Sequence, residues 1–275
     1  MAENCNHNCG SCSANCSERS AESLLASLNE NSSVKKIIGI VSGKGGVGKS
    51  SVTALLASMM AQKGYRTAVL DADITGPSQG KCFGIKEKAM GDGVVIYPFI
   101  SEKYGIQVMS VNMMLENDEV PVLWRGPILA GVVKQFYSEV LWQDVDYMFV
   151  DMPPGTGDVP LTVFQSIPLD GIIIVTSTQA LAGMVVSKAI NMANAMNIPV
   201  LGLLENMSYV ECDNCHEKLY VFGESHIHEV ADMFNLPILG RLPLKTTITK
   251  AIDEGTVEDI RAEELNTCIE VIEEW

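Results

Sequence analysis

Basic residues are scarce in this sequence. The 275 residues include 19 lysines and arginines against 34 aspartates and glutamates, which gives a formal net charge of -15 at pH 7. Proteins that hold nucleic-acid backbones use clustered lysine and arginine, and the sequence has no basic stripe of that kind. We therefore expect no nucleic acid among the partners of this protein.

Long hydrophobic runs are also missing. No stretch approaches the roughly 18 consecutive apolar residues of a membrane-spanning helix, and the first residues lack the positive and apolar regions of a secretory signal. We expect a soluble, cytoplasmic protein that does not bind membranes. Its hydrophobic fraction of 47% is sufficient for a single α/β domain with a sizeable core.

Short apolar runs alternate with helical patterns from Val34 onward. Several runs are apolar nearly throughout, as strands buried on both faces should be, and the segments between them place apolar residues on one helical face. This alternation predicts an α/β fold, with a mostly parallel sheet and helices on both of its faces. Ligands should bind at the carboxyl ends of the strands. The expected strands are residues 36-42, 66-71, 106-111, 146-151, 170-176, 199-205 and 237-242.

A candidate phosphate-binding loop follows the first expected strand and precedes an expected helix, which is the context of a true P-loop. Glycines let backbone N-H groups converge on phosphate oxygens, Lys49 would reach the β- and γ-phosphates, and Ser50 would offer its hydroxyl to Mg²⁺. The loop predicts ATP and Mg²⁺ as cofactors; the alternative is a glycine-rich turn without a ligand. Its residues are Gly43, Lys44, Gly45, Gly46, Val47, Gly48, Lys49 and Ser50.

Two expected strands end in aspartates that are followed by Gly/Pro turns, at residues 71-78 and 151-158. An apolar strand ending in Asp is typical of the Walker B element, whose carboxylate holds Mg²⁺ or its water shell, so we assign that role to Asp151. Asp73 would orient or deprotonate the attacking water. The alternative for both residues is that they cap the helices that follow.

Eight cysteines occur in a chain for which structural disulfides are not expected. Cys82 and Cys268 stand alone beside apolar residues and should be small buried hydrophobic residues. The other six form two clusters, at residues 5-16 and 212-215, and such clustering indicates metal.

The chain resembles the deviant-Walker ATPases, because it has three of their long motifs in the same order. These are the P-loop with an extra lysine, Lys44, at its second position, the segment 71-78 and the segment 151-158. Within that group, residues 34-260 are similar to the Mrp/Nbp/ApbC iron-sulfur cluster carriers. The similarity extends to Trp124-Arg125-Gly126-Pro127 and to the segment from Glu205 to Cys215.

The resemblance implies a homodimer with nucleotides near the subunit interface. Lys44 would then reach the phosphate bound by the partner subunit. Asn206 and the backbone near Pro243 would contact adenine. Ser51 stands where the family usually has threonine, and either hydroxyl can contact phosphate.

The same resemblance gives Cys212 and Cys215 a specific role. In such carriers a Cys-x-x-Cys from each of two subunits supplies four thiolates to one bridging, transferable [4Fe-4S] cluster, and soft thiolates suit such a cluster. Without the resemblance, the pair is interpreted as half of a zinc knuckle with His216 nearby, or as a redox dithiol.

Residues 1-34 are rich in Asn, Ser and Cys and have too few apolar residues to fold without a metal. We divide the chain into this cysteine-rich metal-binding segment with its linker and a P-loop ATPase domain at residues 35-275. Four cysteines within twelve residues can hold a second [4Fe-4S] cluster or one Zn²⁺, and an unmetallated tail is the third alternative. Some family members carry four cysteines here at wider intervals. The ligands would be Cys5, Cys9, Cys12 and Cys16.

These features predict a weak ATP hydrolase that carries a labile [4Fe-4S] cluster to apo iron-sulfur proteins. One rival, a positioning ATPase of the MinD or ParA kind, would need a basic amphipathic helix to bind membrane. Residues 257-275 instead hold seven acidic residues and one arginine, and they predict a packed helix with an acidic outer face. The other rival, an electron donor resembling the nitrogenase iron protein, takes its cluster cysteines singly from separate loops.

Overall fold

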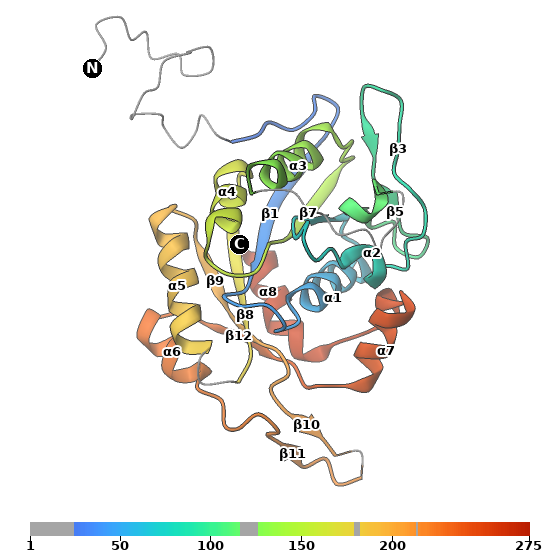
Figure 1. Ribbon diagram of the computed structural model, residues 1–275. Coiled ribbons are helices and arrows are strands. Elements are labelled where there is room, and N and C mark those ends of the chain that lie inside the picture. The colour runs from blue at the N-terminus through green and yellow to red at the C-terminus, as the bar shows by residue number, and fades with distance from the viewer. Residues whose placement is uncertain (1–24, 116–125, 179–181, 213) are drawn as a thin grey trace, which may run out of the picture.

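The computed structural model describes residues 25-115, 126-178, 182-212 and 214-275. Eight strands of this part form one sheet, which contains all seven strands expected from the sequence (Figure 1). The strands are β1 (Val34–Val41), β2 (Thr67–Asp71), β5 (Phe99–Ile100), β6 (Gln107–Met109), β7 (Val145–Asp151), β8 (Gly171–Thr176), β9 (Val200–Glu205) and β12 (Ile238–Arg241). Their spatial order is β12-β9-β8-β1-β7-β2-β6-β5. All neighbours are parallel except β5, which pairs antiparallel with β6 at one edge.

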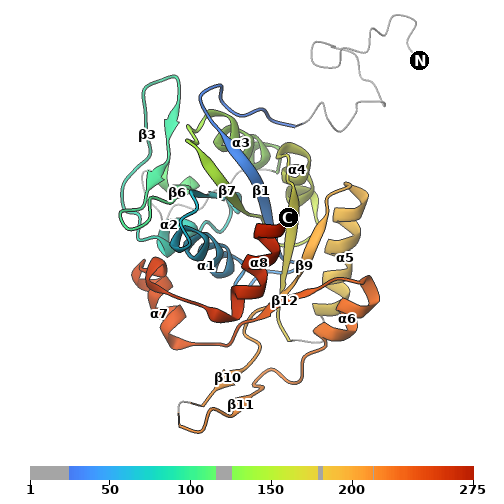
Figure 2. The ribbon, with the colours of Figure 1, turned by 180° about the vertical axis from the view of Figure 1, so that it is seen from behind.

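Helices pack on both faces of the sheet, as expected (Figures 1 and 2). One face carries α3 (Gly126–Glu139), α4 (Asp158–Ser166), α5 (Ala182–Ala195) and α6 (Ile227–Phe234). The other carries α1 (Lys49–Gln62), α2 (Gln79–Cys82), α7 (Thr246–Glu254) and α8 (Asn266–Glu274).

Strand residues alternate between the two cores. In β8, Ile172 and Ile174 pack on the first face and Ile173 and Val175 on the second, and all four are buried. Successive side chains of a strand point to opposite faces, so a strand covered on both sides is apolar throughout. This is why the central strands could be located from uninterrupted apolar runs.

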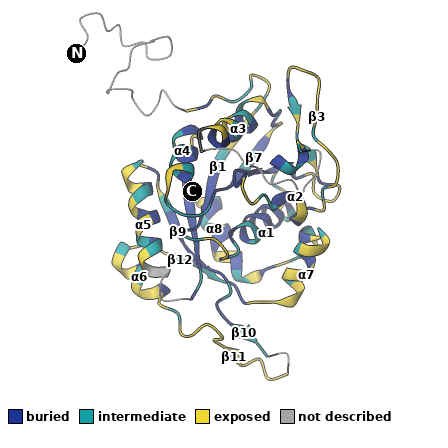
Figure 3. Ribbon diagram, viewed as in Figure 1, coloured by how far each residue is buried: buried dark blue, intermediate teal, exposed yellow. Residues whose placement is uncertain are grey.

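Two short antiparallel pairs lie outside the sheet and were not expected. They are β3 (Met90–Gly91) with β4 (Ile96–Tyr97), and β10 (Val210–Glu211) with β11 (Lys218–Leu219). The second pair projects away from the sheet and its helices (Figure 1). Figure 3 shows its outer part as exposed, and every residue from 214 to 224 is exposed.

The C-terminal tail is helical over a shorter span than predicted. Two turns of 3₁₀ helix, Val257–Asp259 and Glu263–Leu265, precede α8. The expected packing is present, since Leu265, Ile269 and Ile272 are buried. No helix within the described ranges is both long and apolar enough to traverse a lipid bilayer.

Candidate functional site

The glycine-rich loop of residues 43-48 joins the carboxyl end of β1 to the start of α1. Gly48 has a left-handed backbone conformation with φ of 74°, and a Cβ placed on it would lie 2.2 Å from Asn206 Nδ2. A Cβ on Gly43 would lie 2.0 Å from Val185 Cγ1 and 2.7 Å from the Val185 carbonyl oxygen. Glycine is therefore required at both positions, since α5 and residue 206 approach the loop backbone directly.

Lys49, Asp73 and Asp151 converge beside this loop. Lys49 is 5% exposed, and its ammonium group pairs with Oδ1 of the fully buried Asp151. Asp73 Oδ2 lies 3.9 Å from the same ammonium group. The convergence follows from topology: β7 lies between β1 and β2, so their carboxyl ends meet at one edge of the sheet. The arrangement sets a cation of the phosphate-binding loop against two carboxylates able to ligate a metal or its waters.

The helix-capping role considered for the strand-end aspartates is performed by Asp71. Its Oδ2 accepts hydrogen bonds from the backbone N-H groups of Ser78 at 3.0 Å and Gln79 at 3.1 Å, and from Ser110 Oγ at 2.9 Å. Burial, reinforced by the charge of Asp151, raises the pKa of Asp71 to about 7. Burial also raises the pKa of Asp73, and the charge of Lys49 opposes that rise. Asp71 therefore fixes the loop that carries Asp73.

Ser51, Asn206 and Pro243 line one cavity of about 160 Å³ next to the P-loop. Asn206 Nδ2 donates a hydrogen bond to the carbonyl oxygen of Val47 at 2.9 Å, so this side chain touches both the loop and the cavity. Asn206 and Pro243, which the resemblance implied for adenine, thus line the same cavity as Ser51, which it implied for phosphate. Lys44 lies half-buried in the loop.

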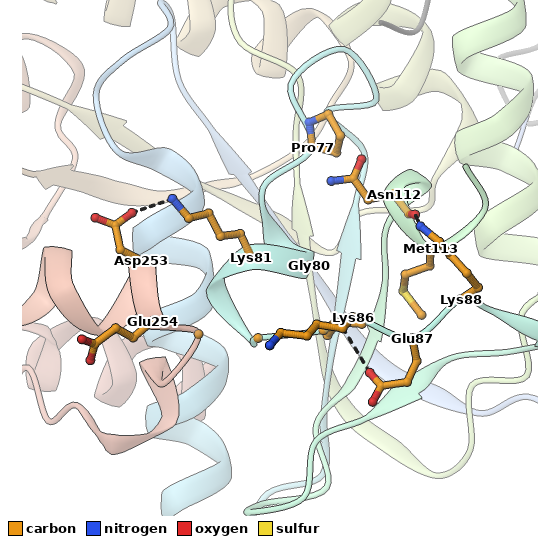
Figure 4. A pocket seen from close by; sticks show the side chains of 13 residues that line it. Pro77, Gly80, Lys81, Lys86, Glu87, Lys88, Asn112, Met113, Asp253 and Glu254 are labelled. Carbon is orange, nitrogen blue, oxygen red and sulfur yellow. Dashed lines mark hydrogen bonds and ion pairs between the residues drawn. The ribbon is translucent and has the colours of Figure 1, made fainter. Parts of the chain in front are cut away.

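A larger cavity of about 370 Å³ lies between residues 77-88 and the end of α7. Figure 4 shows its lining, which holds lysines and acidic residues but none of the predicted site residues. The Lys81 ammonium group lies 2.6 Å from Asp253 Oδ1 at its rim.

Cys212 and Cys215 lie in the connection between β10 and β11, Cys212 half-buried and Cys215 exposed. The Cys212 N-H donates to the Glu217 carbonyl oxygen at 3.0 Å, and the His216 N-H donates to the Cys212 carbonyl oxygen at 2.9 Å. His216 Nδ1 lies 2.9 Å from Glu211 Oε1. Among the residues described, no three His, Cys, Asp or Glu side chains are arranged to hold a metal ion. The pair is thus not completed by His216 into a three-ligand site.

The two remaining single cysteines, Cys82 and Cys268, are buried as predicted. The N-terminal cysteines, Cys5, Cys9, Cys12 and Cys16, lie outside the described residues.

Comparison with known proteins identifies the family of this chain. The ParA family described as "NUBPL iron-transfer P-loop NTPase" matches residues 33-274. The chain belongs to this family of iron-transfer P-loop NTPases. It is similar to the iron-sulfur cluster carrier protein of Clostridium perfringens, with 42% identity over 93% of this chain and 95% of the relative. The iron-sulfur cluster carrier protein of Methanocaldococcus jannaschii is 41% identical, over 93% and 90% of the two chains.

Solved structures agree with this family of P-loop NTPases. The nucleotide-binding protein of Archaeoglobus fulgidus, in complex with ADP, aligns with a TM-score of 0.77 and 39% identity, over 85% of this chain and 91% of the other. The cell division ATPase MinD of Pyrococcus furiosus aligns with a TM-score of 0.63 and 19% identity, over 87% and 98%. The second similarity shows a shared fold only.

Sequence reasoning missed one residue that contacts the candidate site. Gln79 follows directly on the 71-78 motif, and its Nε2 donates to Asp151 Oδ2 at 2.7 Å. The residue type alone does not predict this contact, because the contact depends on the pairing of β2 with β7 in the sheet. Its position just after a strand-end aspartate loop was the available signal.

Proposed function

We propose that this protein is an ATP-dependent homodimeric carrier in the cytoplasm, which holds a labile [4Fe-4S] cluster on Cys212 and Cys215 and transfers it to apo iron-sulfur proteins. The observation that carries the proposal is the presence in one chain of a buried Lys49-Asp151 pair beside a P-loop and a Cys-x-x-Cys on a projecting hairpin. The names of the relatives from C. perfringens and M. jannaschii support the same function.

The residues at the end of β1 fit a nucleotide with its magnesium ion. The backbone N-H groups of residues 43-48 and Lys49 would hold the phosphates, since the loop is open at Gly45 and Gly46, where an added Cβ would meet no atom within 4 Å. Carboxylate and hydroxyl oxygens suit Mg²⁺, so Asp151 and Ser50 would hold it. The ion, when bound, would neutralise charge that develops on the transferred phosphoryl group.

The chain's own side chains would act around that centre. Lys49 would exchange the Asp151 carboxylate for phosphate oxygens when ATP enters. Asp73, whose pKa is raised by burial, would orient or deprotonate the attacking water. Lys44 would contact the phosphate of the partner subunit. Asn206 and the backbone near Pro243 would bind adenine in the 160 Å³ cavity, and Ser51, which also lines it, would contact phosphate.

The cluster would be cargo shared by two copies of the chain. Each hairpin offers two thiols, whereas a cubane cluster takes four thiolates, so a second copy would complete the ligand set. The apolar residues Leu219, Tyr220, Val221 and Phe222, each between 44% and 55% exposed, follow the cysteines closely. Contiguous exposed apolar side chains are typical of surfaces that meet another protein. The N-terminal cysteines would hold a second [4Fe-4S] cluster or zinc.

A short segment from Glu205 to Tyr209 joins the two sites and supports coupling between them. Asn206 contacts the P-loop, and Tyr209 packs edge-on against Tyr220 of the hairpin arm, with ring centroids 6.4 Å apart. ATP binding would change the dimer geometry and slow hydrolysis would reset it. The carboxylate of Glu205 anchors this segment and accepts hydrogen bonds from Ser208 Oγ, Ser225 Oγ and Arg241 Nε.

The test compares three variants after anaerobic reconstitution with iron and sulfide. The double change of Cys212 and Cys215 to Ala should abolish transferable iron and sulfide while leaving nucleotide binding intact. The change of all four N-terminal cysteines to Ala should keep cluster transfer to an apo acceptor, and Lys49→Ala should lose nucleotide binding but keep the cysteine-bound iron. Unchanged transferable iron and sulfide in the double variant would contradict the proposal.

A further inference from the structure

Gln79 joins three elements of the nucleotide site from a fully buried position at the first residue of α2. Its Nε2 donates hydrogen bonds to Asp151 Oδ2 at 2.7 Å and to the Ser50 carbonyl oxygen at 3.1 Å. Its backbone N-H donates to Asp71 Oδ2 at 3.1 Å. The loop after β2 is thereby tied to the end of β7 and to the first turn of α1.

The orientation of the Gln79 amide is fixed by its neighbours. Asp151 Oδ2 and the Ser50 carbonyl oxygen are both acceptors, so the NH₂ end must face them, and a flipped amide would set oxygen against oxygen. The carbonyl end, Oε1, is buried, and no described residue donates a hydrogen bond to it. A buried acceptor without a donor is costly, and a bound water molecule is one of the partners that can satisfy it.

The two oxygens of Asp151 have separate partners. Oδ2 accepts from Gln79, whereas Oδ1 pairs with the Lys49 ammonium group and lies 3.4 Å from Thr53 Oγ1. Because Gln79 holds one oxygen, the carboxylate cannot rotate freely, and Oδ1 stays turned toward the P-loop. The amide therefore decides which carboxylate oxygen faces the phosphates.

We propose that Gln79 is a positioning residue of the magnesium site. This inference rests on the nucleotide-binding function proposed above. Gln79 Nε2 fixes the Asp151 carboxylate, and its Oε1 accepts a hydrogen bond from a water molecule of the hydrated ion that accompanies the nucleotide. Magnesium in proteins usually keeps several of its waters, and these need acceptors around them. Gln79 Oε1 is a buried acceptor beside Asp151 that fits this need.

The experiment measures the affinity of a fluorescent ADP analogue in the presence of Mg²⁺ and in the presence of EDTA. In Gln79→Leu the amide is replaced by an apolar group of similar size. We expect the tightening of binding by Mg²⁺ to fall by about tenfold, as expected for a lost hydrogen bond to a charged centre, while affinity in EDTA changes by less than about twofold. Should that variant not fold, Gln79→Asn, which keeps an amide but shortens its reach, gives the same comparison.

Gln107→Leu is the matched control. Gln107 is also a buried glutamine, but both ends of its amide are hydrogen-bonded, to the backbone of Gln143 and away from the P-loop. Its loss should lower stability without changing the effect of Mg²⁺.

Three outcomes would overturn the proposal. Full Mg²⁺ tightening in Gln79→Leu would show that Gln79 does not serve the ion. Equal loss of affinity in EDTA and in Mg²⁺ would show that it acts only by holding the fold. If the unchanged protein itself showed no Mg²⁺ tightening, the nucleotide-binding part of the proposed function would fail with it, which separates that failure from the first two.

Discussion

The proposed nucleotide site and the cysteine hairpin differ in how their side chains are held. Lys49 and Asp151 are almost fully buried, and contacts from β1, β7, α1 and α2 hold them together. Cys215 is exposed on a connection between two strands of two residues each. Fixed charges are most effective where water is excluded, whereas thiols that pass on a cluster, as we propose for Cys212 and Cys215, must be reachable. The same chain thus provides rigidity at one site and access at the other.

The largest contrast should appear in thiol reactivity. Burial raises the pKa of Cys82 to about 12 and also raises that of Cys268, whereas Cys212 and Cys215 lie on the hairpin. Since the thiolate is the reactive form, Cys82 and Cys268 in the native protein should react with iodoacetamide at least about 10³-fold more slowly than Cys215. Mass spectrometry of peptides after timed labelling at pH 8 measures this ratio. Similar rates at Cys82 and Cys215 would contradict the contrast, and labelling in denaturant provides the control.

The same contrast explains what sequence could predict. The P-loop and the seven main strands could be located because the loop is rich in glycine and several of the strands are apolar nearly throughout. The hairpin strands β10 and β11 have two residues each and no apolar period, so the sequence indicated only their cysteines.

Contacts between distant segments were not predictable. Asp71 and Asp73 are both strand-end acids, and only the structure distinguishes the capping residue, Asp71, from the one near Lys49, Asp73. Gln79 belongs to the site because the carboxyl ends of β2 and β7 are neighbours in the sheet. Such pairings are set by tertiary packing, and the local sequence pattern does not predict them.

The junction between the two regions should be the next most sensitive point. Glu205 is 1% exposed and accepts hydrogen bonds from two serines and Arg241. In Glu205→Gln the charge opposite Arg241 is lost and an NH₂ group faces existing donors, so we expect a loss of about 3 kcal/mol in the free energy of unfolding. Guanidinium denaturation measures it, and hydrogen exchange should quicken at residues 208-225.

Glu254→Gln is the control for that change. Glu254 is exposed and lies 3.7 Å from Lys250 on α7, so its loss should cost less than about 0.5 kcal/mol. If the two variants were equally stable, the Glu205 carboxylate would not be the anchor between the nucleotide cavity and the hairpin.

Asp71 should make the buried site respond to pH. Its pKa is about 7 in the folded protein against 3.8 ordinarily, chiefly because of burial, so between these values the native state holds a proton that the unfolded chain has released. Stability from this group is therefore complete below about pH 4 and is lost as pH rises to about 7. Relative to Asp71→Asn, the protein should lose about 2 kcal/mol between pH 5 and 7, with little further change above about pH 8. Denaturation of both proteins at several pH values gives the difference, and a difference independent of pH would refute it.

The smallest effect is expected at the rim of the larger cavity, where α2 meets α7. The Lys81-Asp253 pair is short, at 2.6 Å, but its side chains are 64% and 58% exposed, and the hydrogen bond from Lys81 raises the lysine pKa without anchoring a buried group. Exposed ion pairs contribute little to the free energy of unfolding, because both charged groups are also well solvated when unpaired. Lys81→Ala should therefore leave the denaturation midpoint unchanged. The helices instead meet through backbone, since a Cβ on Gly255 would lie 2.2 Å from Gly84 Cα. Gly255→Ala should therefore destabilise the protein measurably. If Lys81→Ala destabilised it to the same degree, the exposed ion pair rather than close backbone packing would hold α2 in place, together with Gln79 at its start.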